Sequence, residues 1–189
     1  MMRALLMAAL VALALPPESA MAQSSQFKGW AAISKELSTR IAPKDQPLDL
    51  DEFLPSESMD DLLGTWTTFG TEHHFRNGVP NALNMTIWHV ALSGFAKAVG
   101  QSCTTPRLAF HPRFIATLHK LCAWPAAESR DERVLLEFWT SVMGYNASED
   151  EYVAWRDFFL REYATQPAAE AIAAMTFAIT MNPSFLLHK

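Results

Sequence analysis

The chain has 189 residues, half of them hydrophobic, and a formal net charge of −5. That length suffices for one domain with a proper core. Mild acidity without a run of Lys or Arg argues against nucleic acid or an anionic membrane surface as the main partner, because such binding depends on clustered cations.

Residues 1–22 have the three parts of a secretory signal peptide: a basic start at Arg3, an apolar run from Ala4 to Leu15 and an Ala-x-Ala ending at Ala22. The apolar run is too short to remain as a membrane anchor. We therefore expect cleavage after Ala22 and a single helical domain at 23–189, in the periplasm or outside the cell and without a transmembrane anchor.

Apolar residues recur at helical spacing along most of the remaining chain, and no stretch alternates with the period of a strand. We expect helices at 27–39, from Ser56, from Asn84 or Thr86 to about Gly100, from Pro112, after a Ser129 cap, from Ser148 and at 167–181. Gly144 should close the helix before it in a left-handed conformation. Ser148 and Glu151 have the spacing of a capping box at the next helix start.

The helix from Pro167 to Met181 is apolar on nearly every face, and its only charge is Glu170. Such a helix is stable in water only when other elements surround it. We therefore predict an all-α fold, an irregular or orthogonal bundle of about six to seven helices around this central C-terminal helix.

Cys103 and Cys122 are the only cysteines. In an oxidising compartment an even pair is most simply a disulfide, and we predict that bond. It requires the eight residues after Cys103 to run back along the preceding helix, because a tight hairpin would hold the two cysteines apart.

The longest segment without helical periodicity is the loop at 67–82, which contains Glu72-His73-His74 and extends past Asn77. Long loops in compact domains are often functional. With His111 and His119, the two loop histidines are candidate metal ligands, whereas the alternative that we favour is a polar loop with solvent-facing imidazoles. No catalytic motif, P-loop or haem attachment motif is present, so we predict no catalytic residue and no cofactor.

The tryptophans are numerous for this length, and most should lie in the core: Trp30, Trp66, Trp88, Trp124, Trp139 and Trp155. Large aromatics left partly exposed anchor protein interfaces, so a few of them are candidates for a partner-binding face.

The segment with Trp124-Pro125, Ser129 and Glu132, followed by two helices and the ending 181–189 (MNPSFLLHK), resembles a known C-terminal helical module. That module belongs to large uncharacterised secreted proteins of planctomycetes and myxobacteria, often beside cytochrome c modules. Phe27 to Leu50 is also similar to the start of small helical subunits of periplasmic sugar-alcohol dehydrogenases. Neither resemblance supplies a catalytic residue.

Together these features favour an exported, non-enzymatic helical protein that binds another exported protein, as an accessory subunit of a periplasmic or surface redox assembly. The alternative is a metal-binding protein or enzyme that uses the Glu72–Asn77 loop with His111 and His119. A small-ligand carrier with a pocket between aromatic helices is a third hypothesis.

Overall fold

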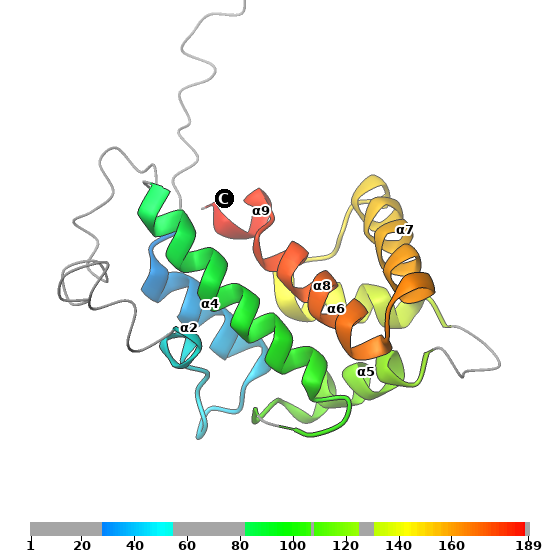
Figure 1. Ribbon diagram of the computed structural model, residues 1–189, viewed down its shortest axis with the longest axis horizontal. Helices are drawn as coiled ribbons and strands as arrows, with labels where there is room; N and C mark the ends of the chain where they lie inside the picture. Colours follow the sequence, from blue (N-terminus) through cyan, green and yellow to red (C-terminus); the bar gives the residue numbers. More distant parts are fainter. Residues whose placement is uncertain (1–27, 55–81, 107, 125–130, 188–189) are drawn as a thin grey trace, which may run out of the picture.

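The computed structural model describes residues 28–54, 82–106, 108–124 and 131–187, and these residues form helices and connecting segments with no β-strand. In chain order the elements are α2 (Trp30–Ile41), the short 3-10 helix η2 (Leu50–Phe53), α4 (Ala82–Gln101), α5 (Pro112–Cys122), α6 (Arg133–Met143), α7 (Glu149–Thr165), α8 (Ala168–Thr180) and α9 (Pro183–Leu186). The helices cross at varied angles (Figure 1), which confirms the predicted all-α irregular bundle.

Helix α8 is the centre of this bundle, as predicted, because it contacts α4, α5, α6, α7 and α9. Its large apolar side chains Ile172, Met175 and Ile179 are buried. Thr176 and Thr180 are buried as well, and each hydroxyl donates to the carbonyl four residues earlier, at 2.7 and 3.0 Å. The helix therefore buries no unsatisfied hydroxyl, which would otherwise cost free energy.

The most extensive helix contact is between α4 and α8, which lie close because small residues face each other there. A Cβ atom added to Gly100 would lie 2.1 Å from the carbonyl oxygen of Ala169 and 3.1 Å from the Cβ of Ala173. Gly100 of α4 and the alanines of α8 thus permit a close approach of the two helices.

The start of the described chain is fixed to its end. The backbone N–H of Lys28 donates to the carbonyl of Leu186 at 2.7 Å, and the Lys28 ammonium pairs with Glu36 at 2.8 Å. Arg40 pairs with the same carboxylate at 2.9 Å, and both cations lie over the ring of Phe185, at 5.2 and 5.8 Å from its centre. This cluster attaches α2 to α9, whose Phe185 and Leu186 are buried in the core.

Arg40 also reaches α6, where its guanidinium donates to the carbonyl of Val142 at 2.9 Å. Gly144 follows in the predicted left-handed conformation, with φ of 76°. A Cβ atom at Gly144 would lie 2.6 Å from Nε of Arg40, so the glycine provides both the backbone turn and the space for this side chain.

Cys103 and Cys122 form the predicted disulfide, with 5.4 Å between their Cα atoms. The chain between them first runs away from Cys103 to the start of α5, where the His111 N–H donates to the Ile41 carbonyl at 2.8 Å. Helix α5 then returns to Cys122 (Figure 1). The bond therefore joins the ends of α4 and α5.

Most predicted helix ends agree with the structure, including the Ser148–Glu151 capping box of α7. The predicted cap, Ser129, lies outside the described residues; α6 begins later than expected, at Arg133, whose N–H donates a hydrogen bond to the side chain of Asp131 at 3.1 Å. An aspartate two residues before the helix thus satisfies a free amide that a serine cap would otherwise satisfy.

The expected signal peptide at 1–22 and the expected helix from Ser56 lie outside the described residues. Among the helices that the structure describes, none is both long and apolar enough to cross a membrane.

Candidate functional site

The outer surfaces of α5 and α6 form a groove of about 630 Å³. Its lining consists of Arg113, Ala116, Thr117, Lys120, Arg133, Leu136, Glu137, Thr140, Ser141 and Asn146. We call this hollow the α5–α6 groove. It spans about two turns of each helix, and small or apolar side chains lie between the charged ones.

Helix α5 presents this surface because its two faces differ. Pro112 stands at the first helical position, and Phe114, Leu118 and Leu121 are buried in the core. On the other face of the helix, Arg113, Ala116 and Lys120 are exposed. An amphipathic helix therefore leaves its cations on the groove side.

Helix α6 forms the opposite wall in the same way. Its core face contains Val134, Phe138 and Val142, whereas Leu136 is only partly buried and Glu137 is exposed. The buried residues hold the helix in place, and five other side chains of α6 line the groove: Arg133, Leu136, Glu137, Thr140 and Ser141.

The two walls are joined beneath the groove by Thr117 of α5, which is 6% exposed. Its hydroxyl lies 3.1 Å from the Arg113 carbonyl and 3.4 Å from Oε2 of Glu137. Among the described residues that line the groove, Glu137 is the only acid, and this contact holds its carboxylate against α5.

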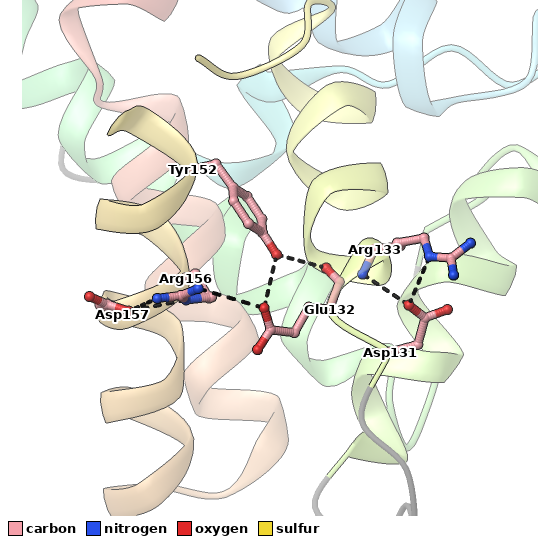
Figure 2. A network of polar contacts seen from close by, with 6 residues as sticks. All are labelled: Asp131, Glu132, Arg133, Tyr152, Arg156 and Asp157. Carbon is pink, nitrogen blue, oxygen red and sulfur yellow. Dashed lines mark hydrogen bonds and ion pairs between the residues drawn. The ribbon is translucent and has the colours of Figure 1, made fainter. Parts of the chain in front are cut away.

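A polar network borders the groove where α6 begins (Figure 2). The Tyr152 hydroxyl of α7 lies 3.3 Å from the backbone carbonyl and 3.4 Å from Oε2 of Glu132, while Arg156 lies 3.8 Å from the same carboxylate and 3.0 Å from Asp157. Burial and the nearby Glu132 carboxylate raise the pKa of Tyr152, so the phenol stays protonated and acts as a donor. The network docks α7 on α6 and contains no activated nucleophile or base.

Arg133 follows Glu132 of this network in the chain, and its side chain lines the groove. Figure 2 shows Arg133 and Asp131 on the side of α6 away from α7, with 3.6 Å between Nε and the carboxylate. Both side chains are largely exposed, so the pair contributes little to stability, but it offsets the charge of Arg133 within the groove.

A second hollow, of about 440 Å³, lies between α2 and the segment leading to η2. Its polar groups already bond to one another: the Trp30 indole N–H donates to Asp51 at 2.7 Å, and the Leu48 N–H donates to the Ser38 hydroxyl at 2.9 Å. The charged residues that line this hollow are Lys35 on one wall and Asp49 and Asp51 on the other.

A third hollow lies between α6, α7 and α8 and is lined by Leu135, Trp139, Tyr152, Trp155, Arg156, Met175 and Ile179. Its volume of about 10 Å³ matches a single water molecule. The structure therefore shows no preformed cavity for a small-molecule cargo in this aromatic region.

The candidate metal ligands are not brought together in the described part of the chain. His111 precedes α5 and His119 lies in its last turn, so they are separated by about 12 Å along the helix axis. Both are exposed, and the described residues contain no group of three or more His, Cys, Asp or Glu that could hold an ion. His73 and His74 lie outside the described residues, so the site with all four histidines stays a prediction.

Half-buried tryptophans are Trp30 and Trp155, whereas Trp88, Trp124 and Trp139 are buried in the core, and Trp66 lies outside the described residues. Neither half-buried tryptophan lines the α5–α6 groove. Sequence reasoning therefore missed this site, although a signal was present: Arg113 and Lys120 lie seven residues apart on the polar face of one helix.

No family model, no curated protein and no solved structure shows a significant match to this chain.

Proposed function

We propose that this chain is an exported, non-enzymatic accessory protein that binds another exported protein through the α5–α6 groove. The observation that carries the proposal is the groove itself: a hollow of about 630 Å³ between two packed helices, in which Ala116 and Leu136 lie among charged and polar side chains. Partner helices commonly bind in such grooves.

The chemistry of the described residues favours binding over catalysis. The Glu132–Tyr152–Arg156 network is a structural contact between helices, and the walls of the groove contain no Cys, His or buried acid that could serve as nucleophile or base. The two sequence resemblances, to a secreted helical module and to small dehydrogenase subunits, support the assignment to an accessory subunit.

A photo-crosslinking experiment tests this function. A benzophenone amino acid replaces Ala116 on the floor of the groove, and in a matched control it replaces Ala31, which is exposed on α2. The chain is expressed with its own residues 1–22 in its native host, and the envelope is irradiated. We expect one stoichiometric adduct from Ala116 and none from Ala31.

Native mass spectrometry of the gently isolated species then measures the stoichiometry. A lone chain, together with no specific adduct at Ala116, would refute the proposed function. Metal analysis of the same untagged sample tests the alternative, since a stoichiometric ion would favour a site with His73, His74, His111 and His119.

A further inference from the structure

The charge of the α5–α6 groove is opposite to that of the chain as a whole. Its lining contains three cations, Arg113, Lys120 and Arg133, and one anion, Glu137, in a protein of net charge −5. Potentials at an interface are generally complementary. A groove that is locally basic on an acidic protein therefore selects an acidic partner surface.

Arg113 and Lys120 are the cations available for that partner. Arg133 is already paired with Asp131, at 3.6 Å. Arg113 and Lys120 have exposed side chains and form no ion pair within the described part of the chain. Their charge is thus free to bind carboxylates.

The spacing of these two cations indicates the shape of the partner. Seven residues along α5 correspond to two helical turns, about 10.5 Å. Ala116 lies between them, and Leu136 provides an apolar contact on the opposite wall. A partner helix with carboxylates seven positions apart and a small apolar residue between them would match all of these features.

We propose that the α5–α6 groove binds an acidic amphipathic helix of the partner protein, with two carboxylates on Arg113 and Lys120. The inference rests on the proposed function and adds the chemistry of the partner. A helix is favoured over an added strand, because the described residues offer no sheet edge to extend. Two free cations are also too few for nucleic acid, whose binding needs many phosphate contacts.

The test uses the processed full chain and a labelled helical peptide of about 15 residues, with two Glu seven positions apart and Ala and Leu on the same face. Binding is measured by fluorescence polarisation at low and high salt. We expect saturable binding that weakens as salt rises. The double variant Arg113→Glu with Lys120→Glu should weaken it about tenfold, as expected for two exposed ion pairs.

Two controls keep the test specific. The variant Lys44→Glu with Lys97→Glu makes the same change in net charge at exposed positions outside the groove and should leave binding unchanged. A peptide with Lys in place of both Glu should bind the Arg113→Glu, Lys120→Glu variant better than the original protein. That exchange also shows that the variant is folded.

The following outcomes would overturn the inference. An acidic peptide that fails to bind at about 1 mM, or binds no better than the basic peptide, excludes an acidic helix as occupant. Equal losses in the groove and control variants exclude Arg113 and Lys120 as its contacts. If Ala116 still yields a stoichiometric adduct, the proposed function stands and only the chemistry assigned to the partner fails.

Discussion

Tyr163 links the last turns of α7 to the end of α5, because its hydroxyl donates to the carbonyl of Leu121. The ring stacks obliquely on Phe159, 4.3 Å away, which is fully buried. Burial favours the neutral phenol and raises the pKa of Tyr163 well above its ordinary value of 10.0.

This shift predicts a loss of stability at alkaline pH. In the unfolded chain Tyr163 ionises near pH 10, whereas in the folded chain it stays protonated to higher pH. The stability gained from keeping Tyr163 protonated in the fold is complete below pH 10. It declines as pH rises further, because the unfolded state then loses the proton first.

The Tyr163→Phe variant should lose this alkaline decline in its unfolding free energy. At neutral pH it should be about 1 kcal/mol less stable, since the bond to Leu121 is removed. Urea unfolding at pH 7 and pH 10.5 checks both effects, and no free cysteine is present to start disulfide exchange. An identical alkaline decline in both proteins would assign it to another group.

At the scale of single residues, features that depend on near neighbours in the chain could be predicted better than contacts between residues far apart in the sequence. The Ser148–Glu151 capping box and the left-handed Gly144 depend on neighbours a few residues away and are confirmed. The bond between Tyr163 and Leu121 joins residues 42 positions apart, so it depends on how α7 and α5 meet in space.

Of the glycines that the structure describes, Gly100, where α4 meets α8, has the least room for an added Cβ atom. Changing Gly100 to Ala places a methyl group against the backbone oxygen of Ala169, which moves only if the whole helix shifts. We expect destabilisation of about 2 kcal/mol despite the better helix propensity of Ala.

Thermal and urea unfolding measure this effect, with Gly29→Ala as the comparison. A Cβ at Gly29 meets nothing within 4 Å, and because Gly29 caps α2 the change should cost less than about 1 kcal/mol. Equal stability of Gly100→Ala and the original protein would show that α4 and α8 separate easily.

The helices themselves could be predicted because apolar residues recur at helical spacing and residues typical of helix starts and ends flank them. Pro112 marked the start of α5, and the nearly charge-free composition of α8 indicated its central place. The start of α6 was misplaced by several residues, since Asp131 and Ser129 are both plausible signals and only the folded chain selects between them.

At the scale of the whole molecule, the disulfide holds two neighbouring helices together at their ends. Cys103 and Cys122 are 19 residues apart, and closing such a loop restricts the unfolded chain. Replacing both cysteines with Ala should lower the unfolding free energy by about 3 kcal/mol.

Denaturant unfolding with and without a reducing agent provides the check. The reductant should destabilise the original protein by a similar amount and leave the double variant unchanged. A loss much below 1 kcal/mol would show that packing of α5 alone already restricts this loop.

The fold class could be read from the sequence, but the α5–α6 groove could not. A helical pattern shows that Arg113 and Lys120 face away from the core, yet it does not show which outer faces another helix covers. The groove forms only when α6 packs beside α5 and places Leu136 and Glu137 opposite these two cations.

The central position of α8 also determines when the chain can fold. Because α8 follows α4, α5, α6 and α7 in the chain, these helices are synthesised before the surface that they cover. The contact between Lys28 and Leu186 likewise joins the beginning of the described chain to its end. Until α8 has been synthesised, the helices that pack on it lack their common partner, so the core cannot close.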